Sequence, residues 1–392
     1  MIELNGITWD HKRGFDPLIH VTKEFESLHP DIKITWKKRS LRDFGDYPVE
    51  KLAADYDLLL IDHPFTGEAC RKQLYVDLET CISPEHFELV RKQEIGRSFS
   101  SYCYDGKQLA FPVDVAALVS ASRDDLLEKL GIERPQNLSE VFRLRERLPS
   151  GMEILAPLCP TDIWCLFLSL CAADAGDAFL REQDGIDPAV GGRQIENIRA
   201  LAKICGGNPF AMNPVHVLDE MSCREDAVYC PFLFGYVNYS IPGNYPNIVR
   251  FYNSPLWESA RYAPILGGVG IAISSQCAHT GSAARFVEYV TLPEVQKGIY
   301  FSGGGQPGQR DAWLSSEINQ ASNGFFQNTI ETIEHAYLRP RVPNWNRFQE
   351  TGSVALCDGI SKNMKTDTIL QKLNELYHEY LKTGEGLLSA SI

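Results

Sequence analysis

Two aspartate–histidine pairs stand where predicted strands end, and their residue types are suited to chemistry. Asp10 and His11 follow the strand-like segment LNGITW, and Asp62 and His63 follow the apolar run YDLLLI. Because ligands of α/β sheets bind beyond the carboxyl ends of the strands, both pairs are expected at one edge of the same cleft. The pairs permit hydrogen bonding to ligand hydroxyls, acid–base catalysis by a carboxylate-oriented histidine, or metal binding through His11, Asp62 and His63. Hydrogen bonding is the simplest of the three, and we expect no metal and no cofactor.

Aromatic and charged neighbours add to these pairs. Trp9 and Arg13 flank the first pair, and each either faces a polar ligand or has an ordinary role, Trp9 in the core and Arg13 at the surface. Tyr236 and Asn238 belong to the segment GYVNYS. Its tyrosines offer an apolar face and a polar tip to a ligand, or they are satisfied core residues.

Residues 261–310 form a Gly-rich unit that we interpret as the back wall and hinge of a cleft. The segment GGVGIAIS predicts a buried strand whose glycines, Gly268 among them, allow close backbone approach. The loop SGGGQPGQR contains Gln306 and Arg310, which can present polar groups to a ligand. A second loop, RPRVPNWNRFQE, is broken by prolines and has interdomain packing as its simplest role.

Composition excludes several classes of function. With 392 residues the chain is too long for one typical core, so two domains are expected. A net charge of −13 argues against a nucleic-acid surface, which needs clustered Lys and Arg. The apolar stretch WCLFLSLCAADA has roughly half of the ~20 residues that span a bilayer, so no membrane insertion is expected.

The N-terminus and the cysteines bear on the compartment. MIELNGITWD enters a strand-like pattern directly, without a basic and apolar leader. The 11 cysteines are odd in number and show no CxxC or metal-finger spacing, so most are expected to be buried small side chains in a reducing compartment. As it stands, the sequence predicts a cytoplasmic monomer. If a leader has been trimmed, the expected compartment is the periplasm.

The N-terminal part alternates between predicted strands and helices. Strands are expected at 4–9, 33–40 and 56–63, and helices near Asp16 and at 48–56. Asp16 followed by Pro17 has the form of a helix start, with the aspartate as cap and the proline in the first turn. The rhythm indicates a doubly wound α/β layer with a parallel sheet covered on both faces. Further helices are predicted at DIWCLFLSLCAADAG, GRQIENIRALAKIC and TILQKLNELYHEYLKT.

The order of several residues resembles the extracellular solute-binding proteins, family 1, which are the carbohydrate receptors of ABC importers. That family has a Gly, a Pro before an extended crossing, a DLxxKxG helix and a further Pro, matched here by Gly106, Pro112, Asp125, Leu126, Lys129, Gly131 and Pro135. Its GGxxxAIS strand is matched by Gly267, Gly268, Ala272, Ile273 and Ser274. The resemblance covers most of the chain.

The resemblance implies a two-domain α/β fold of the type 2 periplasmic-binding-protein kind. Each lobe is expected to be a mostly parallel sheet flanked by helices, with the ligand cleft between the lobes. Lobe I is expected to comprise residues 1–113 and 262–311, and lobe II residues 114–261 and 312–392 with the C-terminal helices. Asp114 is then expected to line the cleft from the first crossing strand, with a hinge or surface role as its alternative.

The implied function is that of a solute-binding protein that clamps a small polar, carbohydrate-like ligand in the interdomain cleft by hinge closure. Its partners are the ligand and, if the protein is exported, ABC permease subunits. The alternative is a cytoplasmic enzyme that has recruited the fold and uses His11, His63 and Asp62 in acid–base chemistry on a small polar metabolite. Binding is preferred to catalysis. The sequence contains no GxSxG elbow and no P-loop, and other acid–base chemistry stays open. A ligand sensor for a protein partner is a third reading.

Overall fold

The computed structural model describes residues 1–40, 49–256 and 262–381. The main strands of the described part are β1 (Ile2–Trp9), β2 (Ile32–Arg39), β3 (Leu58–Ile61), β6 (Phe111–Ser122), β7 (Glu153–Ile154), β10 (Ala227–Phe234), β11 (Arg250–Tyr252) and β12 (Leu266–Ile273). They form one sheet in the order β2-β1-β3-β12-β6-β10-β7, with β11 beside β6. Two short hairpins stand apart, β4 (Cys103–Tyr104) with β5 (Lys107–Gln108) and β8 (Leu180–Arg181) with β9 (Gly185–Ile186).

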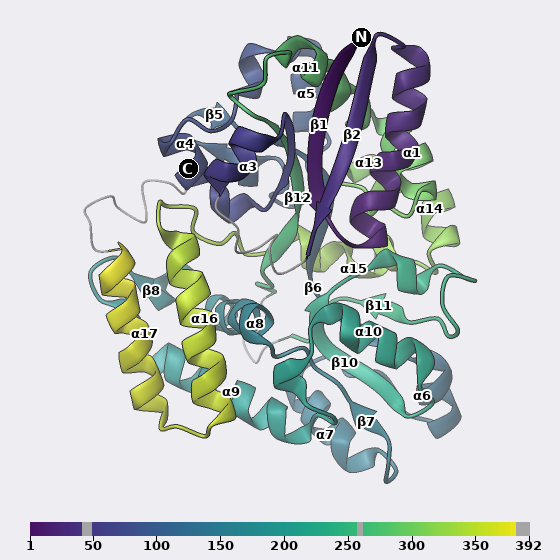
Figure 1. Cartoon of the computed structure of the whole chain (residues 1–392). Helices are drawn as coiled ribbons and strands as arrows, with labels where there is room; N and C mark the ends of the chain where they lie inside the picture. The colour runs from purple at the N-terminus through teal and green to yellow at the C-terminus, as the bar shows by residue number, and fades with distance from the viewer. Residues whose placement is uncertain (41–48, 257–261, 382–392) are drawn as a thin grey trace.

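Strand β6 joins the two halves of this sheet. All of its 12 residues are buried, as expected for the continuous apolar run FPVDVAALVSAS. Its residues up to Ala117 pair with β12, whereas those from Leu118 onward pair with β10. We call β2, β1, β3 and β12 the first sheet half and β10, β7 and β11 the second. In Figure 1 the first half lies at the top and the second at the bottom, with β6 between them.

The sheet is mixed, which differs from the expected mostly parallel lobes. Parallel pairing holds for β1 with β2, β1 with β3, and β10 with β7. Strand β12 runs antiparallel to both β3 and β6, and β10 and β11 run antiparallel to β6. The reason is the path of the chain, because β6 leads from the first half into the second and β12 returns in the opposite direction.

The described helices are α1 (Lys12–Leu28), α3 (Val49–Asp55), α4 (Thr66–Arg71), α5 (Pro84–Lys92), α6 (Asp124–Leu130), α7 (Leu138–Arg147), α8 (Pro160–Ala175), α9 (Pro188–Ile204), α10 (Pro214–Cys223), α11 (Thr280–Val290), α12 (Pro293–Val295), α13 (Arg310–Trp313), α14 (Ser316–Ala321), α15 (Phe325–Glu334), α16 (Trp345–Ser361) and α17 (Thr366–Leu381). Figure 1 shows α1 beside β2 at the top and the neighbouring α16 and α17 at the lower left.

Helix α1 starts earlier than its sequence signal predicted. His11 rather than Asp16 is the cap, because its Nδ1 accepts a hydrogen bond from the backbone N–H of Arg13 at 3.0 Å. Pro17 therefore lies inside the helix. The early start depends on Gly14, where an added Cβ would lie 2.3 Å from the ring of Trp9. Helix and strand thus meet more closely than any residue with a Cβ at position 14 would allow.

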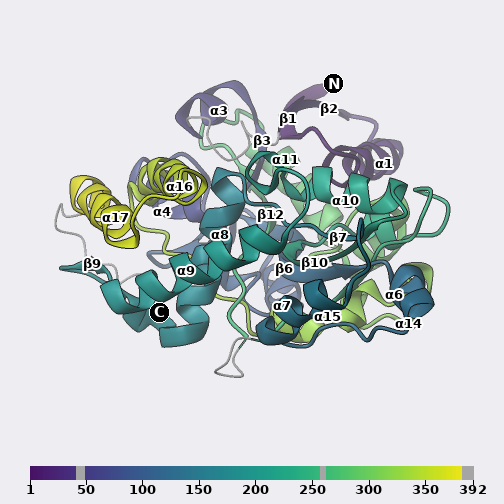
Figure 2. The same cartoon turned by 90° about the horizontal axis from the view of Figure 1, so that it is seen from below.

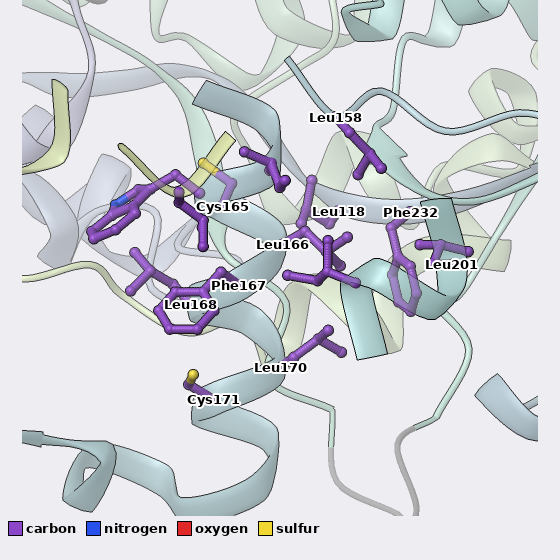
Figure 3. Packing of buried hydrophobic residues seen from close by; sticks show 14 of the residues in the cluster. Leu118, Leu158, Cys165, Leu166, Phe167, Leu168, Leu170, Cys171, Leu201 and Phe232 are labelled. Carbon is purple, nitrogen blue, oxygen red and sulfur yellow. The ribbon is translucent and has the colours of Figure 1, made fainter. Parts of the chain in front are cut away.

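Extended apolar cores pack against both sheet halves. In the first, β1, β3, β12, α1 and α11 contribute buried residues such as Leu4, Phe25 and Phe286. In the second, α8 is apolar on all sides and is almost wholly buried, as such a helix requires. Figure 3 shows Leu166 of α8 near Leu118 of β6 and Phe232 of β10. Figure 2 shows α8 between α16 and the sheet.

No described helix combines the length and the apolar character needed to cross a membrane. All 11 cysteines carry free thiols, and five of them, such as Cys165 and Cys171 of α8, are buried, which is fewer than the majority expected from the sequence. The lobe boundaries expected near residues 113, 262 and 311 stay a prediction.

Candidate ligand-binding cleft

A cavity of about 530 Å³ lies where the two sheet halves meet at β6 and β12. We call it the cleft. From the first half it is lined by Trp9, Arg13, Asp62 and Gly267–Val269. The other lining residues are Ala116, Cys159–Asp162, Cys165, Asn213, Pro214, Phe234, Tyr236, Arg339, Glu350, Ser353 and Val354. Four of the site residues predicted from the sequence thus line it, namely Trp9, Asp62, Tyr236 and Gly268.

Arg13 is held at the floor of the cleft by Asp114. Its Nε donates to Asp114 Oδ2 at 2.7 Å, and its Nη2 donates to the other carboxylate oxygen. Its Nη1 donates to the carbonyl oxygen of Gly235 at 2.8 Å, and the guanidinium lies 4.6 Å from the centroid of the Tyr236 ring. Asp114 itself is buried behind Arg13 and does not line the cleft. It therefore positions the guanidinium that faces the cavity.

Asp62, which is half-buried, forms a second ion pair at the cleft, with the buried Arg339. Its Oδ2 accepts a hydrogen bond from Arg339 Nη2 at 2.7 Å, and its Oδ1 accepts one from the backbone N–H of His63 at 2.8 Å. Burial alone would raise the pKa of Asp62, but the charges and hydrogen bonds of Arg339 and His63 together outweigh it, and the pKa lies well below its usual range. Asp62 is therefore a carboxylate throughout the neutral range, able to accept hydrogen bonds from ligand hydroxyls.

Arg339 reaches Asp62 because its segment is docked on the first sheet half. Arg341 donates to the carbonyl oxygens of Ser100 and Ser101, both at 3.0 Å. Gly67 allows this contact, since an added Cβ there would lie 1.7 Å from the carbonyl oxygen of Arg341. The Nε of Arg339 has no hydrogen-bond partner among the described residues. The guanidinium thus keeps a buried donor at the wall of the cleft.

Neither His11 nor His63 lines the cleft, and each contacts other protein groups instead. His63 is buried, and its Nδ1 lies 3.1 Å from Asp62 Oδ1. His11 caps α1 and packs edge-on against the Tyr236 ring, with the centroids 4.8 Å apart. Burial, supported by nearby arginines, lowers the pKa of each histidine to about 4, so both are neutral at pH 7.

Asp10 is exposed and pairs with Lys38 at 2.7 Å. No described group of three His, Cys, Asp or Glu is arranged to hold a metal.

The remaining predicted site residues lie around the cleft rather than in it. Gln306 is buried, accepts the N–H of Val237 at 3.0 Å and donates to the carbonyl oxygen of Val115 at 2.7 Å. Asn238 lines a separate, smaller cavity. Arg310 pairs with Glu334 at 2.6 Å, outside the cleft.

Sequence reasoning passed over Asp162, which lies in the first turn of α8 and faces the cleft. The Cys159 thiol donates to its Oδ2 at 3.0 Å, and burial raises the pKa of Asp162 to about 7. Burial and Asp162 raise the pKa of Cys159 well above its usual range, so its thiol is not an activated nucleophile. The signal in the sequence was CPTD before an apolar run, since Pro160 marks a helix start.

Gly268 shows why a glycine stands at the wall of the cleft. Its φ is 111°, and an added Cβ would lie 2.3 Å from the carbonyl oxygen of Asp114. We expect Gly268→Ala to lower the free energy of unfolding by at least about 2 kcal/mol, measured by urea denaturation. The control is Gly281→Ala in α11, where a Cβ meets nothing within 4 Å. Equal effects of the two substitutions would contradict this account.

Solved structures share this fold over nearly the whole chain, although no protein-family model matches the sequence. Maltose-bound MalE3 of Thermotoga maritima has a TM-score of 0.84 and 18% identity, covering 97% of this chain and 100% of its own. An ABC transporter solute-binding protein of Agrobacterium radiobacter with ribitol has a TM-score of 0.82 and 17% identity, covering 98% and 99%. One from Agrobacterium vitis with D-mannitol has 0.80 and 13%, covering 97% and 99%.

These likenesses define the fold class. The chain has the two-lobed α/β fold of the MalE-type solute-binding proteins, as the resemblance implied. The cleft described above lies between its two sheet halves.

Proposed function

We propose that the chain is a member of the extracellular solute-binding proteins, family 1, and holds a small carbohydrate-like ligand in the cleft. The proteins of the same fold named above were solved with maltose, ribitol and D-mannitol, all polyhydroxylated. ABC permease subunits are the partners that follow from this proposal.

The observation that carries the proposal is the composition of the cleft. Phe234 and Trp9 provide apolar aromatic surface, which suits the carbon face of a sugar. Asp62 provides acceptors, and Arg13 uses three of its five N–H groups in its bonds to Asp114 and Gly235. Hydroxyl groups both donate and accept hydrogen bonds. A neutral polyhydroxylated molecule can therefore donate to the carboxylate of Asp62 and accept from the guanidinium of Arg13.

Closure of the two halves around the ligand is the second element of the proposal. The bond from Arg13 to Gly235, which follows β10, already joins the two halves. A ligand that bonds to both sheet halves binds the closed arrangement more tightly than an open one, and so favours the closed arrangement. Small-angle scattering should record a smaller radius of gyration when ligand is added, and an unchanged radius at saturation contradicts closure.

Phe234→Ala is expected to weaken ligand binding by about 10-fold or more, because it removes a partly exposed aromatic face. The ring packs closely against the backbone, since a Cβ on Gly267 would lie 2.6 Å from it. The measurement is the ligand-induced rise in melting temperature, followed by calorimetry with the best compound. Phe142→Ala on α7, outside the cleft, is the matched control. Equal affinity in both variants would refute this role of Phe234.

The enzymatic alternative receives no support from the histidines, since neither His11 nor His63 lines the cleft. A general base must reach the proton it abstracts directly or through one water. The discriminating experiment is prolonged incubation with a bound compound, followed by NMR of the recovered ligand. Unchanged ligand agrees with binding, and a new product identifies an enzyme.

A further inference from the structure

Asp162 is a carboxyl group of the cleft that forms no ion pair with the described residues. It belongs to the first turn of α8, lines the cleft and is 7% exposed. Its Oδ2 accepts a hydrogen bond from the thiol of Cys159 at 3.0 Å. Its Oδ1 has no hydrogen-bond partner among the described residues, yet it is not sealed in the interior and keeps accessible surface at the cleft. Asp162 therefore offers an open carboxyl oxygen to a ligand.

The start of α8 does not account for this side chain. A carboxylate in the first turn of a helix usually accepts a backbone N–H or gains from the helix dipole, and both effects lower its pKa. Asp162 accepts no backbone N–H from the described residues, and burial raises its pKa. The carboxyl group is therefore not a helix cap, and its ionised form is destabilised by burial.

The two arginines of the cleft already have carboxylate partners. Arg13 bonds to both oxygens of Asp114, and Arg339 pairs with Asp62 at 2.7 Å. Neither arginine contributes to the pKa of Asp162, so neither compensates its charge. An ionised Asp162 thus lacks a cation within the described part of the chain.

The balance of charge favours a cationic ligand. Glu350, an exposed residue that also lines the cleft, adds another carboxyl group, so the acidic lining residues outnumber the arginines. An anionic ligand would increase this excess, whereas a cation would supply the missing charge. A protonated amine is a compact cation with several N–H donors, and its hydrogen bonds to a carboxylate are strong.

We propose that the carbohydrate-like ligand of the cleft carries a protonated amine, as an amino sugar does, and that Asp162 is the residue that selects it. The inference rests on the proposed function and names the ligand class of the same cleft. In the complex the ammonium group donates to Asp162 Oδ1, and the carboxyl group releases its proton to the solvent. At about pH 6 the amine is already protonated, so it takes up no proton itself.

The groups around Asp162 make its own proton the one that moves. Cys159 donates to the carboxyl group, and the charge of Asp162 acts on Cys165, Cys230 and Tyr236. Burial raises the pKa of Cys165 and of Tyr236 to about 12, and raises those of Cys159 and Cys230 far above neutral. These four groups stay protonated at neutral pH, whereas Asp162 has a pKa of about 7.

Calorimetry with matched pairs of probes tests the inference. The pairs are D-glucosamine with D-glucose, D-glucamine with D-sorbitol, and chitosan disaccharide with cellobiose, and D-glucuronate is the probe of opposite charge. We expect the amine of at least one pair to bind at least about tenfold more tightly than its neutral partner at pH 7. Asp162→Asn should remove this preference. Asp358→Asn, at an exposed ion pair of α16 outside the cleft, is the control and should keep it.

Proton release separates a direct contact from a structural role of Asp162. Titration of the amine at about pH 6 in two buffers of different ionisation enthalpy should show release of nearly one proton by the wild type and none by Asp162→Asn. The inference is overturned, with the proposed function intact, if neutral partners bind as tightly as their amines or D-glucuronate binds more tightly than D-glucose. An amine preference that persists in Asp162→Asn, or that comes without proton release, also overturns it. Absence of binding by every probe overturns both proposals.

Discussion

Asp114→Ala is expected to lower the free energy of unfolding by about 3–5 kcal/mol, since breaking a buried ion pair leaves an uncompensated charge. Both oxygens of Asp114 bond to Arg13, and both side chains are buried. Arginine stays protonated, so the remaining guanidinium would be left in the protein interior with only the carbonyl of Gly235 as acceptor. Guanidinium chloride denaturation measures the loss.

The matched control is Asp10→Ala, which breaks an exposed pair with Lys38 and is expected to cost at most about 1 kcal/mol. A double variant, Arg13→Met with Asp114→Leu, should regain much of the stability, because it removes both charges together. If the free energy of unfolding of Asp114→Ala lies within about 1 kcal/mol of the wild-type value, the positioning role of Asp114 is contradicted.

Asp162→Asn is expected to abolish a pH dependence of stability between about pH 4 and pH 7. Burial raises the pKa of this carboxyl from 3.8 to about 7, so the folded state holds the proton more tightly than the unfolded state. The resulting stabilisation is fully present below about pH 4 and is lost as the pH rises through about 7. It corresponds to at most about 4 kcal/mol.

Asparagine is neutral at every pH, so the Asp162→Asn variant should gain stability relative to the wild type as the pH rises. Urea denaturation at a series of pH values gives this difference. Asp358→Asn, at an exposed pair with Lys362, is the control and should follow the wild-type profile. A constant difference between Asp162→Asn and wild type from pH 4 to 8 would show that the carboxyl does not titrate in this window.

The fold was largely predictable because its central elements carry strong local patterns. The apolar runs of β3, β6 and α8 need burial on all sides, and they occupy the interior. The glycine of the DLxxKxG pattern has a local physical cause, since Gly131 ends α6 with a φ of 63°. The start of α1 was mispredicted because a tertiary contact, Gly14 against Trp9, overrides the local signal at Asp16 and Pro17.

The cleft was less predictable, since a position at a strand end does not determine what a side chain faces. Trp9 lines the cleft, whereas the next residue, Asp10, is exposed and pairs with Lys38. Asp114 acts through Arg13, a partner about a hundred positions away, and no local pattern indicates that bond. Asp162 was missed for the same reason, because its raised pKa arises from burial against distant segments.

Calorimetric titration of the wild-type protein with mono- and oligosaccharides, sugar acids and polyols tests the central claim most directly. The account predicts that at least one compound binds saturably with measurable heat, and that Phe234→Ala weakens it while Phe142→Ala does not. Absence of heat and of saturation across the whole panel, with a protein shown to be folded, would contradict a carbohydrate-binding cleft.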